Sequence, residues 1–303
     1  MKSRLSRLVP AALVAVLLVG LAACSSSGSG WTGLSGRVDV VAAENFWGNI
    51  AQQIGGSHVQ VTSIISDPNT DPHVYQSDPR DAAEISNAQL VIENGLGYDD
   101  FIDKILATGG RSGRRVLSVQ KVLDVTGSDP NPHVWYWTAR LPQVAGAIAA
   151  QLSALDPKDA ADFSAGAKRF DASLKPLLAT IAAIKKKYAG TKISYTERVP
   201  GYLVDAAGLV LGTPASFSLA IEDGNDPSPQ DTETFDADIT GHKVSVLLYN
   251  SQVVDAQTTK IKQLATSAGI PIVGVSETLP PSYSDFQAWQ LAQDRDLLQA
   301  LGG

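Results

Sequence analysis

The alternation of two kinds of segment is the feature that most constrains the fold of this sequence. Short runs rich in Val and Ile, such as residues 38–43 and 59–65, are followed by stretches with a helical spacing of apolar residues, such as residues 46–54. β-branched residues favour strands, and apolar residues spaced three or four apart favour helices. A chain in which strands and helices alternate forms parallel sheets with helices on both faces. We therefore expect an α/β protein.

The alternation occurs in two blocks. We expect strands at residues 38–43, 59–65, 90–93 and 115–118 in the first block, and at residues 192–195, 210–211, 244–248 and 271–275 in the second. Helices are expected between them, and a last helix over residues 283–301 closes the chain. Ligands of such sheets bind beyond the carboxyl ends of the strands. The loops that follow the strands are therefore where we expect functional side chains.

A long helical region separates the two blocks. One helix is expected over residues 141–155, and another begins at Pro157 and is expected to run unbroken to about Tyr188. At ~1.5 Å per residue, about thirty helical residues span about 45 Å, the length of a whole domain. Its Ala-rich, irregular apolar spacing argues against a coiled-coil arm. We expect a backbone helix (157–189) that joins an N-terminal lobe (36–156) to a C-terminal lobe (190–303).

The first 35 residues have the pattern of an export and anchoring segment. Lys2, Arg4 and Arg7 precede an apolar run, residues 8–21, that is too short to span a bilayer comfortably. Leu-Ala-Ala then stands directly before Cys24, the only cysteine. This resembles a bacterial lipobox, and a plain secretory signal with a chance cysteine is the alternative.

The lipobox resemblance implies a lipoprotein signal peptide over residues 1–23 and lipidation of Cys24. The Ser- and Gly-rich residues 24–35 then form a flexible tether. We expect the folded body to lie outside the cytoplasm, attached to the cell membrane through the lipid alone.

The composition excludes one class of partner. The 303 residues are 44% hydrophobic and 18% charged, as is usual for a globular protein with a substantial core. The formal net charge is −7, and no long basic block follows the short N-terminal run. Because nucleic-acid binding needs a cationic face, we expect no nucleic-acid partner.

Two of the four histidines lie in nearly the same sequence. Asp71-Pro72-His73-Val74-Tyr75 is echoed 60 residues later by Asn131-Pro132-His133-Val134-Trp135, and both copies lie in polar loops. Proline fixes φ and stiffens a loop, so the imidazole after it is held in place. A neutral imidazole held rigidly is a good ligand for a divalent metal. The repeat makes His73 and His133 candidate metal ligands.

Two carboxylates of the second block have the same relation to the predicted strands. Glu197 follows the strand at 192–195, and Glu277 follows the strand at 271–275. Both therefore lie just past carboxyl ends, as the histidine loops do. Two imidazoles and two carboxylates can hold a divalent transition metal. Spacings this long form no local motif, so the pattern alone leaves the set open.

The residues around these four positions resemble the cluster A-I (cluster 9) metal-binding proteins of bacterial ABC importers, over essentially all of the mature chain. Residues 71–75 are similar to the first-ligand motif of that family, Asp-Pro-His-x-(Tyr/Phe), and residues 131–135 to the second, Asp-Pro-His-x-Trp. Glu197, five residues before Tyr202, is similar to the third-ligand segment, where the family has His or Glu. Glu277 occupies the place of a family Asp or Glu. The resemblance implies two α/β lobes joined by one long helix, with the metal in the cleft.

The chain departs from the family pattern at several positions. Asn131 replaces the usual Asp, Tyr136-Trp137 replaces a common Leu-Asp, and Arg-Val-Pro-Gly at residues 198–201 replaces a small-aromatic pair. The His-rich loop of many zinc-specific members is absent.

Some assignments stay open at this point. Ser276, Thr278 and Asp285 compete with Glu277 as the fourth ligand. His58 and His242 are expected to be structural or merely exposed.

The resemblance implies a monomeric solute-binding lipoprotein that captures Zn²⁺ or Mn²⁺ and delivers it to an ABC-type permease. A metal-dependent hydrolase is the alternative, because such a ligand set can hold a catalytic metal with an open position for water. The sequence has no His-Glu-x-x-His motif to support that alternative. A surface adhesin is a possible additional role. Oxygen ligands suit Mn²⁺, but the Irving–Williams order makes Zn²⁺ the tighter ion, and we favour zinc slightly as cargo.

Overall fold

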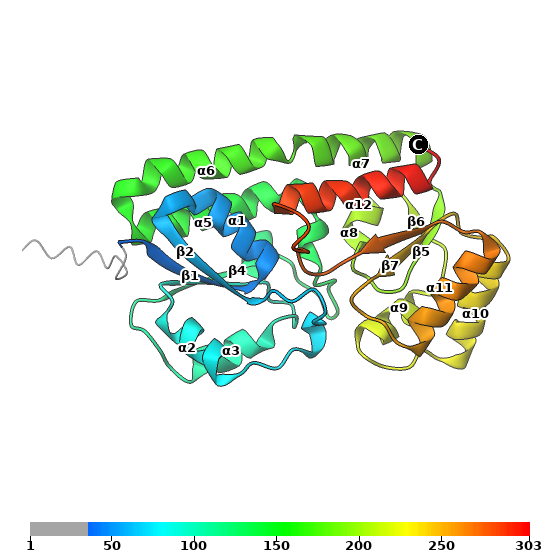
Figure 1. The fold of residues 1–303 in the computed structure, drawn as a ribbon, viewed down its shortest axis with the longest axis horizontal. Coiled ribbons are helices and arrows are strands. Elements are labelled where there is room, and N and C mark those ends of the chain that lie inside the picture. Colours follow the sequence, from blue (N-terminus) through cyan, green and yellow to red (C-terminus); the bar gives the residue numbers. More distant parts are fainter. Residues whose placement is uncertain (1–35) are drawn as a thin grey trace, which may run out of the picture. The chain divides into compact units, whose positions relative to one another are not determined.

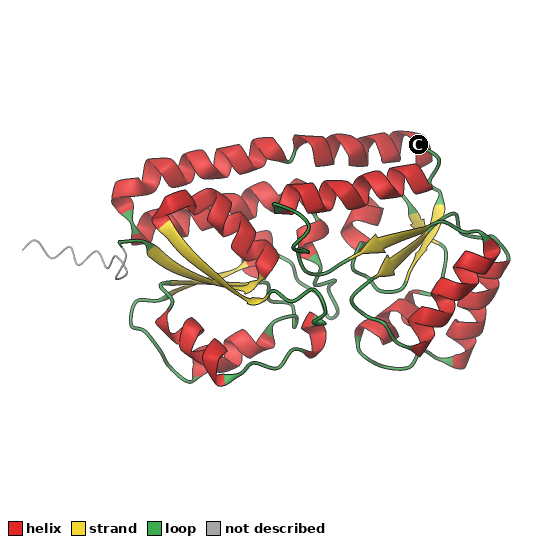
Figure 2. Ribbon diagram, in the orientation of Figure 1, coloured by secondary structure: helices red, strands yellow, loops and turns green. Residues whose placement is uncertain are grey.

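Two four-stranded sheets, each entirely parallel, form the framework of the computed structural model (Figures 1 and 2). The structure describes residues 36–303, so the predicted signal peptide, Cys24 and the tether lie outside the described residues. The strand orders are β2-β1-β3-β4 and β6-β5-β7-β8. In each sheet the chain therefore moves from an inner strand to one edge and then crosses back to the other side. The expected α/β class with two parallel sheets is confirmed.

The first sheet is covered by helices on both faces. Its strands are β1 (Val38–Glu44), β2 (Val59–Ile65), β3 (Leu90–Glu93) and β4 (Arg115–Ser118). The accompanying helices are α1 (Asn45–Gly55), α2 (Pro79–Asn87), α3 (Asp100–Ala107), α4 (Val119–Leu123) and α5 (Leu141–Leu155). Short 3₁₀ turns, among them η1 (Gly56–His58), η2 (Pro72–Val74), η3 (Val134–Tyr136) and η4 (Thr138–Arg140), lie in the connections.

The second sheet repeats this plan. Its strands are β5 (Lys192–Tyr195), β6 (Val210–Leu211), β7 (Leu247–Asn250) and β8 (Ile272–Val275). Its helices are α8 (Gly201–Ala206), α9 (Ala215–Glu222), α10 (Pro229–Thr240), α11 (Ala256–Ala268) and α12 (Phe286–Ala300). Within residues 36–303, no helix is both long enough and apolar enough to cross a membrane.

Alternate strand residues enter the cores on opposite faces of each sheet, as the two-residue period of a strand requires. In β1, Val40 and Ala42 belong to the largest buried cluster, and Val41 and Ala43 belong to a separate cluster. β7 divides its residues between two clusters in the same way. Because both faces are covered, the strands are hydrophobic almost throughout, as parallel strands usually are.

The helical region between the sheets contains two long helices, not one. η5 (Pro157–Asp159) leads into α6 (Ala160–Ser173), and α7 (Lys175–Tyr188) begins after a one-residue break. The prediction of one unbroken helix was wrong because of Pro176, which lies in the first turn of α7. Proline lacks the amide donor and its ring clashes with the carbonyl four residues earlier, so it is tolerated only at a helix start.

The two helices nevertheless follow each other along one side of the molecule, with α6 beside the first sheet and α7 beside the second (Figure 1). α6 packs against α1 and α5, and α7 packs against α12. The largest buried cluster includes Val38 and Phe46 from the first block together with Ile193 and Phe286 from the second. A continuous packed core therefore joins the two sheets.

Side-chain amides of α1 fasten the loop between β8 and α12. Asn45 Nδ2 donates to the carbonyl of Leu279, and Asn45 Oδ1 accepts from the N–H of the same residue, both at 2.8 Å. One turn further, Asn49 Oδ1 accepts from the N–H of Phe286 at 3.0 Å. Because Glu277 lies in this loop, the first block helps to place a candidate ligand of the second.

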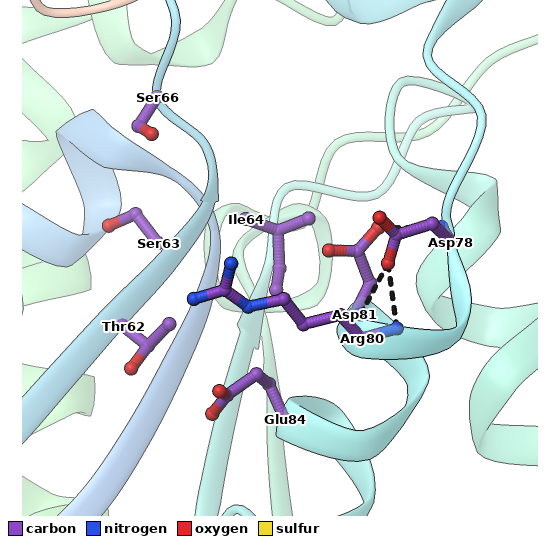
Figure 3. Close-up of a pocket in the computed structure, with 8 residues that line it drawn as sticks. All are labelled: Thr62, Ser63, Ile64, Ser66, Asp78, Arg80, Asp81 and Glu84. Carbon is purple, nitrogen blue, oxygen red and sulfur yellow. Dashed lines mark hydrogen bonds between the residues drawn. The ribbon is translucent and has the colours of Figure 1, made fainter.

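The start of α2 is a capping box. Asp78 Oδ1 accepts from the N–H groups of Arg80 at 2.7 Å and Asp81 at 3.1 Å (Figure 3). Asp81 in turn accepts from the N–H of Asp78 at 2.8 Å. The Arg80 side chain extends from this turn into a polar hollow of about 270 Å³ beside the edge strand β2. The lining of this hollow includes none of the predicted metal ligands.

Candidate metal site

Three of the four predicted ligands meet at one point. His73 lies in η2, His133 directly before η3, and Glu277 two residues beyond β8. The two Nε2 atoms are 3.2 Å apart, and Glu277 Oε2 lies 3.3 Å from that of His73 and 3.4 Å from that of His133. Ligand atoms about 2.1 Å from one tetrahedral ion lie roughly 3.4 Å from each other. The three atoms therefore already have the spacing that a bound ion requires.

The backbone of each histidine is held by the polar residue two positions before it. Asp71 Oδ1 accepts from the N–H of His73 at 2.9 Å, and Asn131 Oδ1 accepts from the N–H of His133 at 3.0 Å. Each is a short-range Asx turn, completed by the intervening proline. This is the local reason why the repeated motif presents its imidazole in a defined direction.

The ring of His133 is also fixed. Its Nδ1 lies 2.7 Å from Asn131 Oδ1, while Asn131 Nδ2 donates to the carbonyl of Arg198 at 2.8 Å. The amide oxygen can only accept, so Nδ1 carries the proton and Nε2 presents a lone pair. His133 is fully buried, and its Nε2 therefore points at the site in a ligating state.

Glu277 is buried and is held by three neighbours. Tyr98 OH donates to its Oε2 at 2.8 Å, and Asn250 Nδ2 donates to its Oε1 at 2.7 Å. Its own N–H donates to Gln252 Oε1 at 2.5 Å. Gln252 also reaches the first block, because its Nε2 donates to the carbonyl of Thr70 at 3.1 Å. One glutamine thus links the loop of His73 to the loop of Glu277.

Glu197 joins the site through Asn250. Asn250 Nδ2, which donates to Glu277, also donates to Glu197 Oε2, at 2.5 Å. Glu197 is 1% exposed, and its second oxygen, Oε1, is buried without a hydrogen-bond partner among the described residues. An uncompensated buried carboxylate oxygen is costly. A cation beside it would remove that cost.

The charges of the site depend on each other. Burial disfavours the charged form of Glu277, but the His133 and His73 imidazoles beside it outweigh this effect and hold the pKa of Glu277 below its usual range. Burial would lower the pKa of His73, yet Glu277 raises it to about 9. Burial, and then the charge of Glu277, raise the pKa of Glu197. Without a metal, protons therefore take the place of a positive ion.

A comparison with protein families identifies the chain. The family model described as the periplasmic zinc-uptake complex component A, ZnuA, matches residues 40–299. The chain belongs to the ZnuA family. The predicted relationship to the metal-binding proteins of ABC importers is thereby confirmed.

Curated relatives of this ZnuA-family chain have names of the same kind. The metal ABC transporter substrate-binding lipoprotein FimA of Streptococcus parasanguinis is 25% identical over 280 residues, which are 86% of each chain. The manganese-binding lipoprotein MntA of Bacillus subtilis is 27% identical over 173 residues, which are 54% of this chain and 56% of MntA.

Solved structures share the fold. The periplasmic zinc-binding protein TroA of Treponema pallidum has a TM-score of 0.74 at 18% identity, with 88% of this chain and 99% of TroA covered. The manganese-bound periplasmic metal-binding protein of Candidatus Liberibacter asiaticus has a TM-score of 0.71 at 21% identity, with 88% of this chain and 100% of that chain covered.

The sequence pattern missed the residues that connect the four candidates. Asn250 was overlooked because we expected the strand at 244–248, whereas β7 ends at Asn250 itself. With the correct strand end, its place beside the carboxyl ends of β5 and β8 would have been the signal. Tyr98 and Gln252 carry no local pattern that would single them out.

The alternative to Glu277 has another role. Asp285 Oδ1 accepts from the N–H of Ala288 at 2.8 Å and so caps α12, and its Oδ2 accepts from Ser284 at 2.9 Å. Both oxygens of Asp285 therefore hold the start of α12. Outside the site, His58 lies between Asp159 (2.8 Å) and Asp162 (3.2 Å).

Proposed function

We propose that this ZnuA-family protein captures a divalent transition metal, Zn²⁺ or Mn²⁺, with His73, His133, Glu197 and Glu277. The observation that carries the proposal is the triangle of two Nε2 atoms and Glu277 Oε2, with sides of 3.2, 3.3 and 3.4 Å. The unpartnered Oε1 of Glu197 supplies the fourth donor. With neutral imidazoles, two carboxylates balance the charge of the ion.

The captured metal is delivered to an ABC-type permease. Family membership and the names of the relatives support this role, since those relatives are substrate-binding lipoproteins of metal ABC transporters. We infer further that lipid on Cys24 holds the protein outside the cytoplasm, as a monomer. A Cys24→Ser form should then appear in the soluble fraction, and identical fractionation of the two forms would disprove the anchor.

Zinc binds more tightly than manganese in this proposal. The two imidazole nitrogens and the tetrahedral spacing suit Zn²⁺, and the Irving–Williams order places Zn²⁺ above Mn²⁺ for almost any such site. Affinity does not decide the cargo, and the names of relatives include substrate-binding lipoproteins of manganese and iron ABC transporters. We favour zinc as cargo. Growth of a deletion strain that is rescued by manganese and not by zinc would overturn this choice.

The protein acts as a binding protein and not as a hydrolase. Four protein ligands fill a tetrahedral site and leave no position for an activated water. Metal-loaded protein should therefore not hydrolyse peptide, ester or phosphate substrates. Hydrolysis that disappears in His133→Ala would favour the enzyme instead.

The ligand set is tested by metal analysis of purified variants. Wild-type protein should bind one equivalent of Zn²⁺ by calorimetry and mass spectrometry, and Glu277→Ala should bind it far more weakly. Asp285→Ala is the matched control. Asp285 lies in the same loop as Glu277, but its carboxylate caps α12. Asp285→Ala should keep the wild-type affinity. Loss of affinity in Asp285→Ala alone would assign to Asp285 the ligand role proposed for Glu277.

A further inference from the structure

A third carboxylate lies beside the two histidines. Glu222 is the last residue of α9 and is 6% exposed. One of its oxygens, one ring nitrogen of His73 and one of His133 all lie within 4.8 Å of one another. The same pair of imidazoles is therefore within reach of two carboxylates that come from different elements, Glu277 and Glu222.

Arg198 donates hydrogen bonds to both carboxylate oxygens of Glu222. Its Nη2 donates to Glu222 Oε1 at 2.8 Å, while its Nε and its backbone N–H donate to Oε2 at 3.0 and 3.2 Å. The guanidinium also pairs with Asp129, through Nη1 at 3.1 Å and Nη2 at 3.2 Å. One cation thus connects a buried carboxylate with one whose side chain is 56% exposed.

This group lines a hollow on the solvent side of the histidines. The hollow has a volume of about 200 Å³ and contains His73, Tyr98, Asp129, Arg198 and Glu222 in its lining, whereas His133 and Glu277 are absent from it. The exposed fractions follow the same order, because the side chain of His73 is 15% exposed and those of His133 and Glu277 are 0% exposed. An ion from solvent meets His73 and Glu222 before it meets Glu277.

The two carboxylates differ in how ready they are to hold an ion. Glu277 Oε2 already has the spacing of a ligand from both imidazoles, at 3.3 and 3.4 Å. One Glu222 oxygen lies within 4.8 Å of a ring nitrogen of each histidine, which is farther than a shared ion requires. Both Glu222 oxygens also accept hydrogen bonds from Arg198. Glu222 can ligate only after the guanidinium has been displaced. This makes it suited to a transient contact and not to a resident one.

We propose that Glu222, with His73 and His133, forms an outer station that receives the incoming divalent cation before it reaches Glu277 and Glu197, and that Arg198 guards this station. The cation replaces the guanidinium as the partner of Glu222, and Asp129 retains Arg198 meanwhile. Only ion pairs are exchanged, so the step forms and breaks no covalent bond. The inference rests on the proposed function, because it concerns the route into the same metal site.

The test measures the rate of metal binding apart from its affinity. Zn²⁺ is mixed with metal-free protein in a stopped-flow instrument, and tryptophan fluorescence reports binding, since the ring of Trp135 lies 5.2 Å from that of His133. Glu222→Gln keeps the shape of the side chain and removes its charge. Its association rate should fall by about tenfold or more, with a dissociation constant within about threefold of the wild type.

Asp226→Asn is the matched control. It removes the same charge from the loop after α9, is exposed, and does not line the hollow. Its association rate should stay within about twofold of the wild type. Arg198→Gln provides an independent arm, because it frees Glu222 and should speed association. Circular dichroism and the unfolding midpoint show that each variant is folded.

The outcomes separate the two claims. An association rate of Glu222→Gln equal to that of the wild type would overturn the outer station. A loss of affinity as large as that of His133→Ala would also overturn it, because Glu222 would then be a resident ligand. Slower association in Arg198→Gln would contradict the proposal that Arg198 blocks Glu222 until a cation displaces it. If the wild-type protein itself binds no Zn²⁺ or Mn²⁺, the proposed function fails instead.

Discussion

The two Pro-His loops are nearly identical in sequence and differ in how firmly they hold their histidine. Asp71 binds only the backbone N–H of His73, whereas Asn131 binds both the backbone N–H and the ring Nδ1 of His133. The side chain of His133 is 0% exposed and that of His73 is 15% exposed. One motif therefore yields one firmly held imidazole and one imidazole that lines the hollow beside Arg198 and Glu222.

The surroundings of the loops explain the difference. The second loop is fastened from three sides, by Asn94 to the carbonyl of Pro132, by Tyr202 to the carbonyl of Asn131, and by Asn131 to the carbonyl of Arg198. The first loop is held by Gln252, which donates to the carbonyl of Thr70. A binding site that must both select and release an ion benefits from such a division between a rigid and an accessible ligand.

The largest expected effect compares removal of the two imidazoles. His133→Ala should weaken Zn²⁺ binding by more than about a hundredfold, which is the upper range for loss of a residue that only supports a ligand, and His73→Ala should weaken it less than His133→Ala does. Water from the hollow can replace the more exposed ligand, but it cannot easily enter the fully buried position of His133. Calorimetric competition with a chelator measures both affinities. His242→Asn is the control, because His242 is exposed at φ 52°, a conformation that asparagine also tolerates. Equal losses at both positions would contradict the division.

The next effect isolates the ring contact of the second loop. Asn131→Ala removes the acceptor of Nδ1 and should weaken metal binding by about tenfold to a hundredfold, as loss of such a supporting contact usually does. Asp71→Ala is the matched change in the first loop and should weaken binding by less than about threefold, because Asp71 contacts only the backbone. Affinity losses of the same size would show that the backbone contacts matter, and not the ring contact.

The difference between the loops could not be predicted from the sequence. The Pro-His repeat is a local pattern, and the positions of Glu197 and Glu277 follow from the order of strands and helices. Both kinds of information can be read from the sequence. The partners of the ring nitrogens depend on which distant segments pack nearby. Arg198 and Tyr202 lie 67 and 71 residues from Asn131, and no local pattern connects them.

Local misreadings explain the remaining differences between expectation and structure. Pro176 divides the predicted long helix, and β7 extends to Asn250, beyond the predicted strand end at residue 248. α9 ends at Glu222, and the approach of this residue to the histidines was missed. Each error concerns a few residues at an element boundary, yet two of them fall on residues at the site.

The pH dependence of binding provides a third comparison, because a proton and the metal compete for His73. Its pKa of about 9, against an ordinary value of 6.5, is set by Glu277 against the opposing effect of burial. Below pH 9 the metal must displace this proton, so affinity should rise about tenfold per pH unit up to that value. The raised pKa of Glu197, caused by burial and by the charge of Glu277, acts in the same direction.

The stability of the metal-free protein should follow the opposite sign. The proton on His73 stabilises the fold fully below pH 6.5, and this contribution is lost as the pH rises to about 9. Calorimetry in two buffers counts the protons released, and chemical unfolding of metal-free protein follows the stability. His73→Gln should reduce both dependences. An affinity that is constant between pH 7 and pH 9 would contradict a protonated His73.

The smallest expected effect concerns the backbone contact of the first loop. Asp71 caps η2 by accepting from the N–H of His73, so Asp71→Ala should lower the free energy of unfolding of the metal-free protein by about 1 kcal/mol, the usual cost of losing a cap. Asp71→Asn keeps an acceptor oxygen and removes the carboxylate charge. Burial and the charge of Glu277 disfavour this charge, because both raise the pKa of Asp71. It should therefore be at least as stable as the wild type in urea. If both substitutions destabilise the protein equally, the carboxylate charge holds the first loop, and the cap does not.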